Sequence, residues 1–404
     1  MGTRVKVVIG ANAGDEGKGN ITSRFAAGHD TIGVLTNGGP QRGHTVVYGG
    51  RRHVFSHFSS GTFTGASTYF GPDFMVNPMQ FVREYEELSE AGVTMPPVYI
   101  DPRCRFTTPF DMMLNQAAHE AAGTHHTCGM GIWETYVRYR DAGKNGPAVP
   151  VGVFLEMTYN QKLLYLLKIR EQAVIRMRES YPKDFCTKWK VIMESPYLPE
   201  HFIADTLFMC ETAGRICRNE ILLTAGHIVM ENGQGLLLDW SDDEILAKYS
   251  TPSRTGAEAA LGLIEDTFVN AEVEMCYVTR TYLTRHGDGP LHGECHPDAI
   301  TPRICERTNV TNPFQGSFRY GKMDVESLSG RINRDYERIF EIGRDKSSGG
   351  GLKEIRGSGE RSICRLHNRY TKSLAITHAD EILPSEELTE ASRSFDRHYI
   401  IASA

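Results

Sequence analysis

The stretch VVIGANAGDEGKGN, from Val7 to Asn20, is the feature of this sequence that most constrains the fold. An apolar, β-branched run at residues 4–9 leads into a turn rich in glycine, and a helical pattern, ITSRFA, follows directly. A buried strand, a glycine-rich turn and a helix in this order surround an anion with backbone N–H groups and a helix N-terminus. The stretch therefore predicts an α/β fold whose first loop binds phosphate, with Lys18 as an added positive charge.

This first loop differs from a standard P-loop. The Walker pattern requires glycine at position 12 and serine or threonine at position 19, where this sequence has Asn12 and Gly19. The loop carries Asp15 instead, and a carboxylate next to a phosphate is repelled unless Mg²⁺ lies between them or the carboxylate transfers a proton. Either role would make Asp15 catalytic, whereas a glycine-rich turn with solvated acids is the structural alternative.

A second glycine-rich loop, TNGGPQRGHTVV at residues 36–47, follows another strand pattern at residues 31–36 and contains His44. A histidine beside Gly43 in such a loop could donate a hydrogen bond to the charge that develops on a phosphate. A lone histidine is also common as a structural residue, so the role of His44 depends on which residues surround it.

Strands and helices alternate along the rest of the chain. Apolar, β-branched runs predict strands at residues 228–230, 275–283 and 373–377, and amphipathic patterns predict helices at residues 79–90 and 154–181. This alternation predicts an α/β fold with a central, mostly parallel sheet and helices on both faces, similar to P-loop NTPases. We expect one domain over residues 1–404, with helical insertions around 79–220 and a small C-terminal lobe around 365–404.

Composition narrows the class of protein. The net charge of −6 provides no general basic field for nucleic acid, and no run of about eighteen apolar residues predicts a membrane span. The nine cysteines are odd in number, include no CxxC pair and follow no secretory leader pattern, which favours reduced thiols. We therefore expect a cytoplasmic protein that binds small molecules, without direct contact to nucleic acid or membrane.

Five motifs together resemble adenylosuccinate synthetase in their order and approximate spacing. They are GDEGKG at 14–19, GGPQRGHTVV at 38–47, ENGQG at 231–235, TRHGDGP at 284–290 and THAD at 377–380. The resemblance implies a homodimeric ligase that phosphorylates the 6-oxygen of a purine nucleoside monophosphate from a nucleoside triphosphate. The amine of L-aspartate then displaces this phosphate. Positioning and neutralisation of charge are most of what such phosphoryl transfer requires, which would explain an acid inside the phosphate loop.

The resemblance also implies roles for individual residues. Asp15 would remove the N1 proton of the purine and would bind Mg²⁺ together with the Gly43 carbonyl. His44 would support transfer of the γ-phosphoryl group, and Gln234 would contact the 6-oxygen edge. The residues implied to bind the two nucleotides are Gly14, Glu16, Gly17, Lys18, Gly19, Gln41, Thr127, Cys128, Arg138, Thr255 and Asp380.

Some of these contacts concern the 5′-phosphate of the acceptor. Thr127 and Thr255 match positions that bind this phosphate within the same subunit. Arg138, or alternatively Arg140, would match the arginine that reaches the same phosphate in the partner subunit of the dimer.

The sequence departs from this family in the segments that recognise the donor and the amino acid. Asp380 matches the carboxylate that reads the 2-amino group of GTP, but His378 replaces the usual lysine two positions earlier. The run of arginines that binds aspartate is reduced to Arg319, within TNPFQGSFRYGKMD. Candidates for holding the amino acid are therefore Arg285, Arg319 and Lys322.

These departures leave the substrates open. Ala13 and Gln41 replace a tryptophan and an asparagine of the family, which suggests a specialised member such as the bacteriophage enzymes that make 2-aminoadenylosuccinate from dGMP. Those enzymes generally carry a smaller residue at the position of Asp15, so IMP is slightly favoured over GMP or dGMP as the acceptor. GTP, ATP and dATP all stay open as donors, and a nucleotide-binding homologue without ligase activity is the alternative from another class of protein.

Two further function classes have little support in the sequence. His286, His292, Cys295 and His296 lie close together, but their spacing matches no common zinc site. A switch GTPase would need the Walker signature and a base-recognition motif, and neither is intact.

Overall fold

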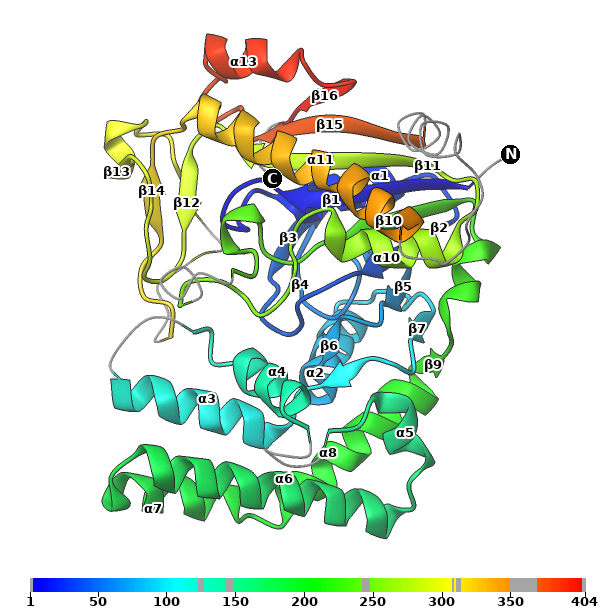
Figure 1. Ribbon diagram of the computed structural model, residues 1–404, viewed down its shortest axis with the longest axis vertical. Helices are drawn as coiled ribbons and strands as arrows, with labels where there is room; N and C mark the ends of the chain where they lie inside the picture. The colour runs from blue at the N-terminus through cyan, green and yellow to red at the C-terminus, as the bar shows by residue number, and fades with distance from the viewer. Residues whose placement is uncertain are drawn as a thin grey trace.

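A nine-stranded parallel sheet forms the centre of the molecule (Figure 1). The computed structural model describes residues 3–122, 127–142, 148–241, 248–306, 309, 314–348 and 369–401. The strand order is β16-β15-β11-β1-β10-β2-β5-β7-β9, and each neighbouring pair is parallel. The strands are β1 (Arg4–Gly10), β2 (Thr31–Leu35), β5 (Ser67–Phe70), β7 (Val98–Ile100), β9 (Gly214–Ile216), β10 (His227–Glu231), β11 (Glu272–Arg280), β15 (Tyr370–Thr377) and β16 (Arg397–Ile400). The predicted mostly parallel sheet is therefore confirmed.

Helices cover both faces of this sheet, so successive side chains of its strands are buried. For this reason the strands appear in the sequence as nearly continuous apolar runs. Val5, Val7 and Ile9 of β1 belong to one apolar cluster, and Val8 belongs to a second cluster on the other face. One cluster includes residues of α10 (Glu258–Thr267) and α11 (Val325–Ser348), which cross the sheet in Figure 1. The other includes Ile21 of α1 (Lys18–Ala26), the helix that the first loop opens.

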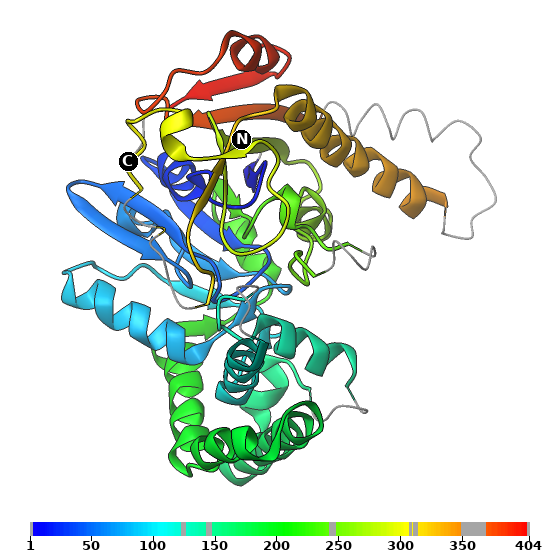
Figure 2. The ribbon, with the colours of Figure 1, turned by 90° about the vertical axis from the view of Figure 1, so that its left-hand side faces the viewer.

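A layer of helices lies at one end of the molecule, below the sheet in Figures 1 and 2. Its core is aromatic, because the Phe106 ring centroid lies 5.1 to 6.4 Å from those of Tyr139, Phe154, Tyr165 and Phe202. The helices of this part of the chain are α2 (Pro78–Glu90), α3 (Pro109–Ala122), α4 (Ile132–Arg140), α5 (Val151–Glu156), α6 (Tyr159–Ser180), α7 (Lys183–Met193) and α8 (Tyr197–Leu207). None of the helices in the described ranges is long and apolar enough to span a membrane.

The helix predicted over residues 154–181 is two helices, so that prediction is wrong in part. α5 ends at Glu156 and α6 begins at Tyr159. The Thr158 N–H donates to the Gln161 side chain at 2.8 Å, and the Gln161 N–H donates to the Thr158 hydroxyl at 3.3 Å. This reciprocal pair is a capping box, which starts a new helix at this point.

The strand predicted over residues 275–283 is also divided. β11 ends at Arg280, and the chain enters a separate antiparallel sheet at Leu283. The smaller sheets are β12 (Leu283–Arg285) with β14 (Arg319–Gly321) and β13 (Glu294–Cys295), the hairpin β3 (His44–Tyr48) with β4 (Arg51–Phe55), and β6 (Met75–Val76) with β8 (Arg105–Phe106). β15 and β16 extend the central sheet, and α13 (Glu386–Ser392) connects them.

The carboxyl ends of five neighbouring strands bring the sequence motifs to one edge of the sheet. GDEGKG, GGPQRGHTVV and ENGQG follow or end β1, β2 and β10, while TRHGDGP and THAD come after β11 and at the end of β15. These strands are adjacent in the order β15-β11-β1-β10-β2. Ligands of open parallel sheets bind outside the carboxyl ends of the strands, so this edge is where a site is expected.

We predict that Phe106→Ala lowers the free energy of unfolding by about 3–5 kcal/mol, because the ring joins several helices and its loss leaves a cavity. The urea-unfolding midpoint, followed by circular dichroism, measures the change. Leu164→Ala is the control, since Leu164 on α6 is 59% exposed and its loss should cost less than about 0.5 kcal/mol. Equal shifts in the two variants would contradict this account of the helical layer.

Candidate active site

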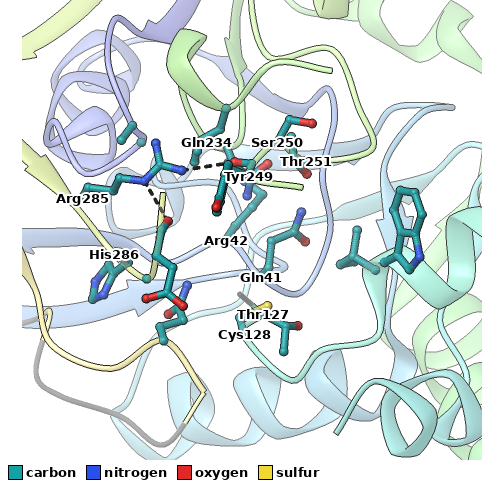
Figure 3. Close-up of a pocket in the computed structure, with 18 of the residues that line it drawn as sticks. Gln41, Arg42, Thr127, Cys128, Gln234, Tyr249, Ser250, Thr251, Arg285 and His286 are labelled. Carbon is teal, nitrogen blue, oxygen red and sulfur yellow. Dashed lines mark hydrogen bonds between the residues drawn. The ribbon is translucent and has the colours of Figure 1, made fainter. Parts of the chain in front are cut away.

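Two cavities meet at the carboxyl edge of the sheet, with volumes of about 670 and 550 Å³. The first lies between the sheet loops and the helical layer (Figure 3), and the second lies towards the C-terminal end of the chain. The residues that line both cavities are Gly14, Asp15, Gly43, His44 and Asn309. The acid of the first glycine loop and the histidine of the second therefore lie at the boundary between two hollows.

The first loop is shaped by its own charged side chains. Gly17 takes a left-handed φ of 83° just before α1, where a side chain would strain the backbone. The Glu16 carboxylate accepts hydrogen bonds from the Asn12 and Gly14 amides at 3.1 and 2.7 Å. Lys18 is buried and donates to the Gly14 carbonyl at 2.5 Å, with its Nζ 3.4 Å from the Glu16 carboxylate. Glu16, expected to bind nucleotide, thus uses its side chain to hold the loop.

His44 lies in a buried polar cluster. Its Nδ1 contacts the Glu231 carboxylate, which also receives the Ser60 hydroxyl and the Ser60 N–H. Arg42 Nη2 lies 3.4 Å from Glu231 Oε2 and 3.0 Å from His44 Nδ1. Burial, together with the charge of Arg42, lowers the pKa of His44 to about 4. The ring is therefore neutral near pH 7, and donation from Nδ1 to Glu231 leaves Nε2 free to interact with a ligand.

Two glutamine side chains line the first cavity. Gln234 has a φ of 57°, and its buried Oε1 has no hydrogen-bond partner among the described residues. Both amide atoms of Gln41 are likewise buried without a partner in the described part of the chain. Unsatisfied buried amides are costly, so these atoms mark where a polar ligand would bind. Thr127, Cys128 and Arg285 line the same cavity, as the resemblance implies.

The helical layer supplies residues that sequence reasoning missed. The Thr127 hydroxyl donates to Asn115 on α3 at 2.6 Å, and Glu134 on α4 lines the cavity beside them. Glu134 is only 5% exposed, and burial raises its pKa to about 7. Its Oε2 has no hydrogen-bond partner within the described ranges. Nothing in the local sequence separates these two residues from ordinary helix-surface residues.

The close packing of α4 against α3 explains their position. Gly131 starts α4 with a φ of 73°. A Cβ at this position would come within 2.7 Å of the Asp111 carbonyl carbon, so glycine is needed for the contact. This contact directs the first turn of α4, which contains Glu134, into the cavity.

The second cavity combines cationic side chains with the carboxylates of Asp15, Glu306, Asp380 and Glu381. Four cationic side chains are among its lining residues, namely Lys18, Arg52, Arg280 and Arg303, together with Gly17 and Gly19 of the first loop. Asp380 also lines this cavity, as the resemblance implies. Burial lowers the pKa of His378 to about 3, so a neutral ring stands where the family has a lysine.

Asp15 and Gly43 form a donor set that fits Mg²⁺. Both offer oxygen atoms, and both lie at the boundary of the two cavities. Mg²⁺ usually takes one or two protein ligands and completes its shell with phosphate oxygens and water. Among the residues that the structure describes, no group of three or more His, Cys, Asp or Glu side chains could hold a metal ion. A metal ion between Asp15 and Gly43 would therefore depend on ligand phosphates for its other contacts.

Comparison with known proteins identifies the family. A family model described as adenylosuccinate synthetase matches residues 7–328. The chain belongs to the adenylosuccinate synthetase family. The adenylosuccinate synthetase of Acaryochloris marina is 28% identical over 312 residues, which are 74% of this chain and 65% of the relative. That of Microcystis aeruginosa is 27% identical over 305 residues, which are 74% and 64% of the two chains. The chain thus spans about two thirds of the length of these curated relatives.

Solved structures of this family share the fold. The fully ligated adenylosuccinate synthetase of Plasmodium falciparum has a TM-score of 0.62 and 15% identity, over 94% of this chain and 78% of that chain. The cyanophage S-2L succinoaminodeoxyadenylate synthetase, bound to dGMP and to dATP as an energy donor, has a TM-score of 0.59 and 13% identity. This match covers 99% of this chain and 93% of the phage chain.

The structure separates the two threonines of the segment YSTPSRTG. Thr255 is fully buried, and its hydroxyl donates to the Gly235 carbonyl at 3.0 Å and lies 3.3 Å from Asp239 Oδ1. It therefore lies outside both cavities. Thr251 and Ser250 line the first cavity instead (Figure 3). Two threonines four residues apart look equivalent in the sequence, and only the path of the loop separates them.

Two arginines that were expected to bind ligands form hydrogen bonds within the protein instead. Arg138 is buried and donates to Asp111 at 2.8 Å and to the Phe106 carbonyl at 2.7 Å, so its guanidinium is held within its own subunit. Arg140, the alternative, is partly exposed at the end of α4 and pairs with Asp141 at 2.6 Å. Arg319 pairs with Glu294 and donates to two carbonyls of the 287–289 loop, outside both cavities.

We predict that Glu134→Gln stabilises the protein more at pH 8 than at pH 5. The pKa of Glu134 is raised from 4.5 to about 7 on folding, so the proton contributes stability that is present below about pH 4.5 and lost as the pH rises through 7. Glutamine does not titrate, so its advantage over wild type should grow by up to about 3 kcal/mol. Urea unfolding at both pH values measures the difference. Glu87→Gln, on the exposed face of α2, is the control. The raised pKa of Glu134 would be contradicted if the stability difference between Glu134→Gln and wild type were the same at both pH values. It would also be contradicted if the control showed the same pH dependence.

Proposed function

We propose that this chain is a ligase that joins the amine of L-aspartate to C6 of a 6-oxopurine nucleotide, with IMP slightly favoured as the acceptor. The observation that carries the proposal is the position of Asp15 and His44 at the boundary between two cavities. The first cavity offers unpartnered amides that suit a purine, and the second offers cations that suit a triphosphate. A phosphoryl group that moves from one ligand to the other must pass this boundary.

In the first step, Asp15 takes the N1 proton of the purine and the 6-oxygen gains negative charge. The oxygen then attacks the γ-phosphorus, so an O–P bond forms at C6 and the bond to the nucleoside diphosphate breaks. Gln234, which lines the first cavity, would donate from its side-chain amide to the 6-oxygen edge. A Mg²⁺ ion held by Asp15 and Gly43 would neutralise negative charge on the transferred group.

His44 assists this transfer through its contact with Glu231. The negative charge of an approaching phosphoryl group favours the protonated ring, and the Glu231 carboxylate on Nδ1 adds to that effect. A protonated His44 can donate from Nε2 to a phosphoryl oxygen in the transition state. Glu231 is suited to this role because His44 and Arg42 outweigh the effect of burial and hold its pKa at about 2.

In the second step, the amine of aspartate attacks C6, a C–N bond forms, and the C–O bond to phosphate breaks. Arg285 is the best-placed cation for a carboxylate of the amino acid, since it lines the first cavity (Figure 3). Within the described ranges its guanidinium donates to carbonyls alone, at 3.2 Å to Asp288, 3.4 Å to Pro290 and 3.3 Å to Tyr249. A carboxylate would make shorter, charge-assisted bonds with the same donors.

A second candidate acceptor is dGMP, as in the cyanophage enzyme solved with dGMP and dATP. Ala13 lines the first cavity where the family has a tryptophan, which leaves more room there. Retention of Asp15 favours IMP, because a carboxylate replaces the smaller residue of the phage enzymes. We propose a homodimer in either case, with Arg140 as the residue that can reach the partner's acceptor phosphate.

We predict phosphate release when the protein is mixed with L-aspartate, Mg²⁺, IMP and one of GTP, ATP or dATP. The experiment is a matrix of IMP, dIMP, GMP and dGMP against these three donors, followed by phosphate release and by ultraviolet absorbance of the purine. Omission of aspartate is the control for simple hydrolysis. Absence of phosphate release in every combination would refute the ligase proposal.

We predict that His44→Gln reduces kcat roughly 100-fold or more while it changes nucleotide affinity less than about tenfold. The reason is that the ring acts on charge that develops during transfer and contributes little to binding of the ground state. Turnover assays and calorimetric binding of both nucleotides measure the two effects. Comparable losses in turnover and affinity would favour the alternative, a nucleotide-binding homologue without ligase activity.

A further inference from the structure

Two consecutive carbonyls of the first loop are held from the donor side of the site. The Asp15 carbonyl accepts a hydrogen bond from Arg280 Nε at 2.6 Å, and the Glu16 carbonyl accepts one from the Thr377 hydroxyl at 2.7 Å. Arg280 and Thr377 are the last residues of β11 and β15 and pair directly in the sheet. The loop that carries the catalytic acid is therefore attached to the strand ends that lead into the second cavity.

Arg280 connects this loop to two acids of the second cavity. Its Nη2 donates to Glu306 at 3.1 Å, and its Nη1 donates to the Tyr282 hydroxyl at 3.1 Å. The Tyr282 hydroxyl in turn donates to Glu381 at 2.5 Å. Glu306 and Glu381 both line the second cavity, and Glu381 directly follows Asp380. Asp15 and the proposed donor-base subsite are thus joined through a single guanidinium.

The geometry of arginine makes this connection rigid. A guanidinium is planar, and its five N–H donors have fixed directions, so it cannot follow one partner without changing its contacts to the others. Arg280 is 5% exposed, and a buried charge that loses a partner is costly. A ligand that draws Glu306 or Glu381 to a new position would therefore also shift the Asp15 carbonyl.

We propose that Arg280 is a positioning residue that couples occupancy of the second cavity to the placement of Asp15. This proposal rests on the ligase function proposed above, because it requires a triphosphate in the second cavity and a monophosphate in the first. A triphosphate in the second cavity should change the affinity of the monophosphate in the first, and thermodynamic linkage requires the same factor in the opposite direction. The connection through Tyr282 carries this effect to the base of the donor.

The test is calorimetric titration of the full chain with IMP, with and without a saturating non-hydrolysable analogue of GTP or ATP, in the presence of Mg²⁺. For the wild type we expect the analogue to change the Kd of IMP roughly fivefold or more, with a reciprocal effect of IMP on the analogue. Tyr282→Phe removes the hydroxyl that joins Arg280 to Glu381 and keeps the ring. This variant should keep both single-ligand Kd values within about twofold while the coupling factor falls towards one.

Two further variants control for structural effects. Tyr277→Phe removes a buried tyrosine hydroxyl of β11, which donates to Asp335 at 2.8 Å and makes no contact with the first loop among the described bonds. This variant should keep the wild-type coupling factor. Arg280→Lys keeps the positive charge but not the planar fork, so it should lose coupling and turnover together.

The outcomes separate this inference from the proposed function. A Tyr282→Phe protein that binds both ligands with the wild-type coupling factor would overturn the role of Arg280 and leave the ligase proposal intact. Equal loss of coupling in Tyr277→Phe would overturn it as well, since removal of a buried tyrosine hydroxyl without contact to Arg280 would then have the same effect. Absence of nucleotide binding to the wild type would overturn both.

Discussion

The parallel alignment of five neighbouring strands is the constraint on which the rest of the structure depends. Because β15, β11, β1, β10 and β2 run in the same direction, their carboxyl ends lie at one edge of the sheet. Loops from distant parts of the chain meet there and enclose two cavities with a common wall. Apolar side chains bury both faces of the sheet, and this packing holds glycine-rich loops in place that would otherwise be mobile.

Buried carboxylates then determine the shape of these loops. Glu16 accepts the amides of its own loop, and Glu231 accepts contacts from His44, Arg42 and Ser60. A buried carboxylate is stable only with such partners, so each acid limits the positions that its neighbours can take. Asp15 differs from them because its side chain lines both cavities. Acids that look alike in the sequence therefore divide into those that hold the loops and one that lies at the boundary of the two cavities.

A feature of the structure could be predicted when neighbouring residues in the sequence encode it, and could not when it depends on contacts made only in the folded chain. An apolar run followed by glycine is encoded by adjacent residues, and the strands around Asp15 and His44 were predicted for this reason. The end of a helix at Glu156 depends on a capping pair that the apolar period does not reveal. Thr255 is implied by the motif PSRTG, and only the folded loop shows that Thr255 is buried while Thr251 lines the first cavity. Glu134 carried no signal at all, since it faces the cavity only through the packing of α4 on α3.

The sequence by itself determined most of the order of strands, loops and helices, the presence of two glycine-rich loops after strands, and the chemical groups available to them. Each of these depends on residues that are neighbours in the chain. The tertiary structure alone decided which groups face a ligand, which are neutral at pH 7, and which arginines are already paired within the protein. These properties depend on direction, desolvation and charge between residues far apart in the sequence, and such distances are set only when the sheet and the helical layer come together.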